Sequence, residues 1–128
     1  MLQGPTTDLV THAPAVQLAV PAVRTATVTG TGIDCQDYEG TMFGVQQVGT
    51  VSGTTPTLDG KFQDSADDST YADITGATFT QVTTSTSVQT IRLLRTKRYV
   101  RYVGTIGGTT PSFACSAALI PPKKSRST

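Results

Sequence analysis

An acidic segment at positions 64–70, with the sequence Asp-Ser-Ala-Asp-Asp-Ser-Thr, holds the residue types best suited to binding a metal ion. The carboxylates of Asp64, Asp67 and Asp68 could supply oxygen ligands to Ca²⁺. Their spacing is not that of an EF-hand, which needs ligands at alternating positions, a central glycine and a terminal glutamate. Asp and Ser in a hairpin loop more often accept hydrogen bonds from their own backbone. The segment therefore favours a turn, and we expect no metal and no other cofactor.

A basic block at positions 92–101 contains half of the lysines and arginines of the chain. Its charged members are Arg92, Arg95, Lys97, Arg98 and Arg101. Tyrosines between them make a surface for single-stranded nucleic acid conceivable. An acidic block of similar size at positions 59–73 offers internal pairing instead, or complementary charge that orients a neighbouring protein. We favour internally paired or solvated faces, then contact with a neighbour in an assembly, and place nucleic acid last.

Residues for nucleophilic or acid–base catalysis are scarce in this chain. The single histidine, His12, lies in a proline-interrupted segment that is poorly suited to holding a base within hydrogen-bond reach. Glu39 is the only glutamate, so a glycosidase pair would have to come from the clustered aspartates. The sequence contains no Walker A motif, dinucleotide-binding glycine pattern or zinc-ligand spacing. We therefore predict that the protein is not an enzyme.

The composition favours an all-β domain. Threonine accounts for 25 of the 128 residues, and no stretch carries a sustained helical period of apolar residues. The net charge of +1 is too small to recruit nucleic acid or a membrane through a general field. No apolar run is long enough to span a bilayer, and the N-terminus lacks the basic start of a signal peptide. Cys35 and Cys115 allow at most one disulfide, and we favour buried thiols.

Segments rich in Thr, Val, Ile and aromatic residues, separated by Gly, Pro, Ser and Asp, predict seven or eight short strands. The clearest cover positions 24–28, 41–48, 58–63, 69–74, 87–94, 97–106 and 112–120. Such a series predicts a β-sandwich or jelly-roll-like domain with an extended N-terminal arm. We place the arm at 1–22, the domain at 23–120 and a basic tail at 121–128.

One phrase occurs twice, as Val-Gly-Thr-Val-Ser-Gly-Thr-Thr-Pro-Thr at 48–57 and as Val-Gly-Thr-Ile-Gly-Gly-Thr-Thr-Pro-Ser at 103–112. Seven of the ten positions are identical, at an offset of 55 residues. Glycine permits positive φ, and Thr-Thr-Pro returns the chain to extended geometry. We interpret both copies as similar hairpin connections between consecutive strands. Descent from a duplication is left open, because the flanking strands do not match.

The N-terminal arm is apolar but is interrupted by Pro14 and Pro21. An apolar arm usually lies in a groove, either on its own domain or on a neighbouring molecule. Val16, Leu18 and Val20 are our first candidates for contact with a neighbour. The basic block at 92–101 is the second candidate, whereas the short tail with Lys123, Lys124 and Arg126 is interpreted as solvated.

Several strand and turn phrases together resemble a known family. They are Gly-Thr-Gly-Ile-Asp at 30–34, Tyr-Glu-Gly at 38–40, Phe-Gln-Asp-Ser-Ala-Asp at 62–67, Tyr-Ala-Asp-Ile at 71–74, Gly-Ala-Thr-Phe at 76–79, Lys-Arg-Tyr-Val-Arg at 97–101 and Gly-Thr-Thr-Pro-Ser-Phe at 108–113. From about residue 25 to residue 120, the chain resembles small β-rich proteins encoded in the head-gene region of tailed phages and prophages, near the major capsid protein. Such proteins are often capsid decoration, or cement, proteins.

The resemblance implies a structural virion protein that binds the outer surface of a phage capsid and stabilises the shell. Its partner would be the major capsid protein, and a homo-oligomer on the capsid lattice is compatible with that role. The protein would be assembled in the host cytoplasm and located on the virion. Two alternatives remain open: a carbohydrate- or receptor-binding β-sandwich module, and a head–tail joining protein.

Overall fold

The computed structural model describes residues 16–38 and 40–121, and this part of the chain consists of strands without a helix. The strands are β1 (Val16–Arg24), β2 (Val28–Thr29), β3 (Ile33–Asp34), β4 (Met42–Ser65), β5 (Ala72–Thr78), β6 (Ser87–Leu93) and β7 (Tyr99–Ile120). The predicted all-β class is confirmed. His12, Glu39 and the three basic residues of the C-terminal tail lie outside the described residues.

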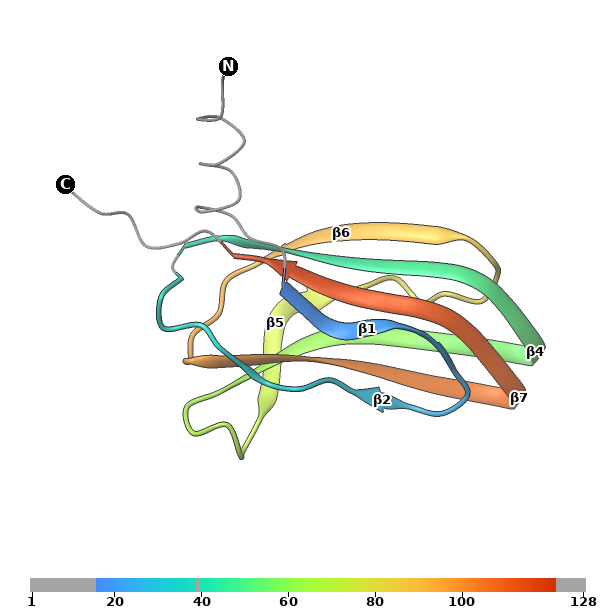
Figure 1. Cartoon of the computed structure of the whole chain (residues 1–128), viewed down its shortest axis with the longest axis horizontal. Coiled ribbons are helices and arrows are strands. Elements are labelled where there is room, and N and C mark those ends of the chain that lie inside the picture. The colour runs from blue at the N-terminus through green and yellow to red at the C-terminus, as the bar shows by residue number, and fades with distance from the viewer. Residues whose placement is uncertain (1–15, 39, 122–128) are drawn as a thin grey trace, which may run out of the picture.

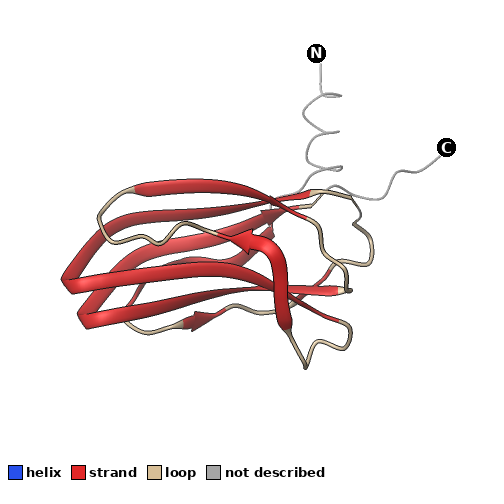
Figure 2. Cartoon of the chain, turned by 180° about the vertical axis from the view of Figure 1, so that it is seen from behind, coloured by secondary structure: helices blue, strands red, loops and turns tan. Residues whose placement is uncertain are grey.

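The two long strands β4 and β7 organise the whole domain. They pair antiparallel along their length, from Phe43 opposite Ile120 to Ser65 opposite Tyr99. Both strands fold over at the same end of the molecule, so that each contributes one half to an upper and one half to a lower layer (Figures 1 and 2). The result is a single antiparallel sheet folded into a β-sandwich-like domain.

Each layer is completed by shorter strands. The β6 layer consists of β6, the first half of β4, the second half of β7, and β1. The β5 layer consists of β5, the second half of β4, the first half of β7, and the short strands β2 and β3. Apolar side chains alternate along the paired strands and fill the space between the layers, as the period of two in a strand requires.

The repeated phrase forms the corner at which β4 and β7 fold over, and our interpretation of it as two hairpin connections is wrong. The copies lie opposite each other, with Thr54 paired to Thr109. These two residues are themselves separated by the offset of the repeat, so the corner has a local pseudo-twofold axis between them. The backbone repeats this symmetry, because Gly53 and Gly108 both have φ of 112°. Gly and Thr-Thr-Pro thus bend two continuous strands instead of ending them.

The two corner glycines are required by close approach as well as by φ. A Cβ atom on Gly53 would lie 2.6 Å from the carbonyl oxygen of Thr110. A Cβ atom on Gly108 would lie 2.6 Å from the carbonyl oxygen of Thr55. Each glycine therefore makes room for the backbone of the other copy, and this accounts for the glycine at the equivalent position of both copies.

The core between the layers has two hydrophobic clusters. The larger one contains an aromatic group of Phe62, Phe79 and Tyr102, with ring centroids 5.6–6.5 Å apart. The smaller one lies towards the corner and includes Phe113. Cys35 belongs to the larger cluster and Cys115 to the smaller one, and both are buried free thiols, as we favoured.

The N-terminal boundary of the domain differs from our expectation. Residues 16–22, which we placed in the arm, form most of β1 and pair with β7. The pairing shifts register twice, and Pro21 falls in the second shifted stretch, between Ala19 and Ala22. A proline can be accommodated there because β1 is at the edge of its layer and the bulge removes one ladder position. The rest of the predicted arm lies outside the described residues.

Candidate docking surface

The acidic segment binds its own backbone. The Asp67 carboxylate accepts hydrogen bonds from the backbone nitrogens of Ser69 and Thr70, at 3.0 and 2.9 Å, and from the Ser65 hydroxyl at 2.9 Å. These donors, led by Thr70, lower the pKa of Asp67. Asp64 is buried and accepts from the backbone nitrogen of Thr96 at 2.8 Å. The turn interpretation is confirmed at Asp67, and the described residues contain no group of three or more side chains placed to hold a metal ion.

Neither thiol is poised for nucleophilic chemistry. Burial raises the pKa of Cys35 to about 11 and also raises the pKa of Cys115. A thiol needs a lowered pKa and access to solvent before it reacts at neutral pH. The cysteines therefore act as small core residues.

The outer face of the β5 layer carries the charged network of the molecule. Lys61 Nζ lies 3.0 Å from the Asp73 carboxylate, which also accepts a hydrogen bond from Gln63. Arg101 donates to Gln63 at 2.9 Å and stacks over the ring of Tyr71, with its guanidinium carbon 4.1 Å from the centroid. The acidic and basic blocks of the sequence therefore meet on this face.

Two further arginines of the basic block are held by the protein itself. Arg98 forms an ion pair of 2.6 Å with Asp34. Arg95 donates to the backbone carbonyls of Cys35 and Tyr38, at 2.6 and 2.7 Å, and so fastens the connection after β3. These contacts support internal pairing as the main role of the block.

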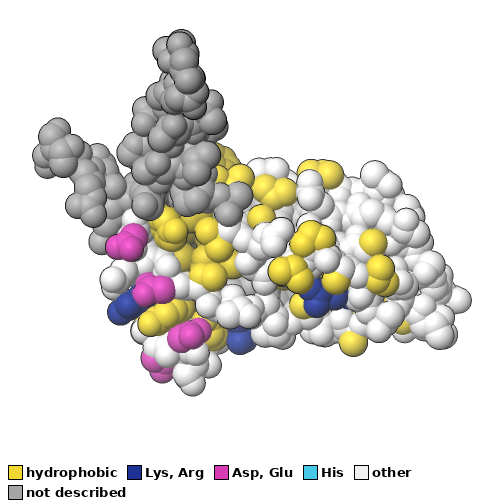
Figure 3. All heavy atoms as spheres, viewed as in Figure 1, with side chains coloured by type: hydrophobic (Ala, Val, Ile, Leu, Met, Phe, Trp, Pro, Cys, Tyr) yellow, Lys and Arg dark blue, Asp and Glu magenta, His cyan; other side chains and the backbone are white. Residues whose placement is uncertain are grey.

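The outer face of the β6 layer, called the apolar face below, carries several exposed apolar side chains. Four large hydrophobic side chains are exposed on its strands: Val20 at 56%, Val23 at 66%, Phe43 at 42% and Val88 at 65%. In Figure 3, the acidic side chains that are visible lie at the end remote from the corner. Polar residues such as Gln47, Thr90 and Arg92 are exposed between these apolar side chains.

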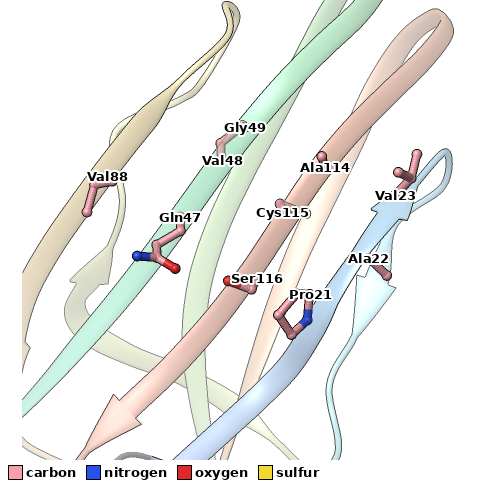
Figure 4. Close-up of a pocket in the computed structure, with 10 residues that line it drawn as sticks. All are labelled: Pro21, Ala22, Val23, Gln47, Val48, Gly49, Val88, Ala114, Cys115 and Ser116. Carbon is pink, nitrogen blue, oxygen red and sulfur yellow. The ribbon is translucent and has the colours of Figure 1, made fainter.

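An open groove of about 410 Å³ runs across this apolar face. Small residues on the central strands, among them Gly49, Ala114 and Ser116, form its floor. Val88 of β6 stands on one side of it, and Pro21 and Val23 of β1 stand on the other (Figure 4). The groove arises because side chains at alternate positions point outwards, and those on the two central strands are small apart from Gln47.

The three contact residues predicted in the N-terminal arm differ in their exposure to solvent. Val20 is exposed on the apolar face, and Val16 is half-buried against the core. Leu18 is only 4% exposed and packs in the protein's own core, so our expectation that it contacts a neighbour is corrected. That expectation depended on apolarity alone, which does not tell the buried Leu18 from the exposed Val20 on the bulged strand β1.

The contact residues predicted in the basic block also differ in their exposure and in their internal contacts. Arg92 is exposed on β6, opposite Phe43 of β4, and therefore borders the apolar face. Lys97 is exposed in the connection before β7. Arg95, Arg98 and Arg101 are engaged in the contacts given above. Only Arg92 of this block joins the apolar face.

Sequence reasoning missed Val23, Phe43 and Val88. A signal for Phe43 exists, because Met42, Phe43 and Val45 put apolar residues at both parities of one strand, with Met42 buried and Phe43 exposed. A strand that is apolar on both faces has a second surface to cover.

Neither a scan of protein-family models nor a search of curated proteins finds a match for the chain. The described residues include no helix that is long and apolar enough to span a membrane.

Proposed function

We propose that the protein is a structural virion component that docks on the outer surface of a phage capsid and stabilises the shell. The observation that carries this proposal is the outer face of the β6 layer, where Val20, Val23, Phe43 and Val88 are exposed and an open groove lies between Val23 and Val88. Exposed apolar patches with a polar surround are typical of surfaces that bind another protein. The resemblance to phage head-region proteins supports the choice of the capsid as partner.

The polarity of the two faces supports a defined orientation on the shell. The apolar face would lie against the capsid, and the ion-paired face of the β5 layer would remain in solvent. Complete burial of one large apolar side chain stabilises by about 1.5–3 kcal/mol, and these four side chains are already partly covered. Each contact is therefore modest, and occupation of many equivalent lattice sites would supply the remaining stabilisation.

Sugar binding receives less support from the tyrosines. Tyr102 is buried in the core, and the ring of Tyr71 is covered by Arg101. Sugar-binding platforms need exposed aromatic faces. A head–tail joining protein would instead form a closed ring in solution, which light scattering during size-exclusion chromatography distinguishes from a smaller species.

The proposal is tested by co-sedimentation with mature, expanded shells of the phage or prophage that encodes the chain. We expect saturable binding and a higher melting temperature of the shell, because a ligand of the assembled state stabilises it by mass action. Val88→Asp should weaken binding by about tenfold or more, since it places a charge in the buried contact. Leu94→Asp is the matched control, because Leu94 is 60% exposed but lies outside the strands of the apolar face.

A folded protein that does not bind shells would overturn the proposal. Equal losses from Val88→Asp and Leu94→Asp would instead show that the apolar face is not the contact surface.

A further inference from the structure

The edge of the β6 layer formed by β6 is regular and open. β6 pairs with β4 at each of its seven positions, from Leu93 opposite Met42 to Ser87 opposite Val48, with no bulge. No strand pairs with its other side within the described residues. An open edge presents unpaired backbone N–H and C=O groups and is a template for another strand.

The alternation of the ladder identifies which backbone groups are unpaired. The backbone nitrogen of Thr86 donates to the carbonyl of Gly49 at 2.9 Å, immediately before the first residue pair of the ladder. In an antiparallel pair, such hydrogen-bonded positions alternate with positions whose groups point away. Val88, Thr90 and Arg92 therefore turn their backbone groups towards β4. Gln89 and Ile91 turn theirs to the open edge.

The other edges of the molecule carry features that discourage pairing. β1 contains Pro21 and two shifts of register, and Arg24 donates from its side chain to the Val20 carbonyl at 2.9 Å. β5 has a shift of register against β4 and a glycine, Gly76, with φ of 78°. β2 and β3 have two residues each. Bulges, prolines and very short strands are the usual means of protecting an edge, and β6 has none of them.

The connection between β5 and β6 leaves this edge accessible. The side chain of Gln89 in β6 holds the connection at Thr80. It accepts a hydrogen bond from the Thr80 backbone nitrogen at 2.8 Å and donates one to the Thr80 carbonyl at 2.9 Å. These bonds use the amide of the side chain and not the backbone of β6. Elsewhere a hollow of about 340 Å³, lined in part by Thr80, Ser87 and Gln89, lies beside the strand.

We propose that two copies of the chain pair antiparallel through β6, with the twofold axis at Thr90. In this register the outward backbone groups of Gln89 meet those of the partner's Ile91, and Thr90 lies opposite the partner's Thr90. Thr–Thr pairs across antiparallel strands are stabilising. Arg92 lies opposite the partner's Val88, so the two arginines are kept apart and each aliphatic stem can cover an exposed valine.

A second copy fits this edge better than an oppositely charged partner strand does. β6 contains one charged residue, Arg92, near one end. Antiparallel pairing places the two Arg92 side chains at opposite ends of the contact, so like charges do not meet. The axis is perpendicular to the layer, so the apolar outer faces of both copies lie on the same side of one continuous sheet.

The pairing does not depend on the proposed capsid function, because its backbone hydrogen bonds come from the strand edge, although Val88 and Arg92 belong to the apolar face as well. Its first test is sedimentation equilibrium of the purified full chain over a wide range of concentrations. We expect a monomer–dimer equilibrium that Thr90→Lys shifts to monomer, with a dissociation constant about tenfold higher or more, since like charges directly opposite each other destabilise a strand pair. Thr75→Lys, at an exposed position of β5, is the matched control and should leave the equilibrium unchanged.

The register has a test of its own. Val88→Glu places a carboxylate opposite the partner's Arg92 and should keep or strengthen the dimer, whereas Val88→Lys should dissociate it. Backbone amide exchange should show protection of Gln89 and Ile91 that increases with concentration and is absent in Thr90→Lys. A protein that stays monomeric at millimolar concentration would overturn the proposal. A dimer in which these two amides exchange freely would overturn it as well.

Discussion

The hydroxyl of Tyr102 donates a hydrogen bond of 2.6 Å to the side-chain oxygen of Gln46, in the middle of the core. Gln46 comes from the β6 layer and Tyr102 from the β5 layer, so this bond joins the two halves of the sandwich. Both side chains are buried. A buried polar pair of this kind constrains how the layers align, because any sliding leaves both groups without partners.

Removing the Tyr102 hydroxyl should therefore be costly. We expect Tyr102→Phe to lower the free energy of unfolding by about 1–3 kcal/mol, because the Gln46 oxygen is left buried without its donor. Urea unfolding followed by circular dichroism measures the change. Tyr99→Phe is the control, since Tyr99 is only half-buried, and a loss as large as that of Tyr102→Phe would contradict the argument.

The ion pair between Asp34 and Arg98 predicts a dependence of stability on pH. The hydrogen bond from Arg98, with a smaller contribution from the backbone of Gln36, lowers the pKa of Asp34 from 3.8 to about 2. The folded-state pKa is below the unfolded-state value, so the contribution of this carboxylate is complete above about pH 4 and is lost as the pH falls through about 2.

This dependence is checked by urea unfolding of the wild-type protein and of Asp34→Asn at a series of pH values. The difference in unfolding free energy between them should be largest near neutral pH and should close towards pH 2. A difference that stays constant over that range would show that Asp34 contributes in another way.

At the scale of elements, the corner of β4 and β7 is the feature that makes two layers from one sheet. The two copies of the repeated phrase bend together around the Thr54–Thr109 pair. Neither copy could form the bend alone, because each corner glycine gives space to the backbone of the other copy. The corner is thus a single structure built from two distant segments.

Alanine at either corner glycine should be destabilising to a similar extent. We expect Gly53→Ala and Gly108→Ala each to lower the free energy of unfolding by roughly 1–3 kcal/mol, because both need positive φ and have backbone atoms within 3 Å of a Cβ. Thermal or urea unfolding measures both. Gly49→Ala is the control, since its Cβ would meet nothing closer than 3.6 Å. Strongly unequal costs at the two sites would contradict the pseudo-twofold symmetry.

At the scale of the whole molecule, the docking face and the pairing edge are separate surfaces of the β6 layer. Val23 is on β1, at the side of the layer opposite to β6. Val23→Asp should weaken binding to shells and leave the monomer–dimer equilibrium unchanged. Ile91→Pro should abolish pairing while the isolated domain still reaches the shell, because the Ile91 N–H faces the open edge and its half-buried side chain lies on the face opposite to Val88.

Co-sedimentation and sedimentation equilibrium of both variants, and of the double variant, check this separation. Effects at distant and independent sites add to within about 0.5 kcal/mol. If Val23→Asp dissociated the dimer, pairing would have to occur through the apolar face, and the two proposals would merge into one.

The amino-acid sequence by itself determined the class of fold, the two charged blocks and the turn at Asp67. Threonine content, alternation of apolar residues and the placement of Gly, Pro and Asp are local signals, and each acts within a few residues. Most strand positions in the domain follow from them. The same signals predict a turn at 48–57 and at 103–112, which we interpreted as hairpin connections.

Only the tertiary structure decided that those two bends meet, that they fold β4 and β7 over instead of ending them, and that Leu18 is buried while Val23, Phe43 and Val88 are exposed. The physical reason is that glycine and Thr-Thr-Pro fix local backbone angles, whereas the direction of the next strand depends on the partner with which it pairs. The face that a bulged edge strand such as β1 presents is decided in the same way, by its register against β7.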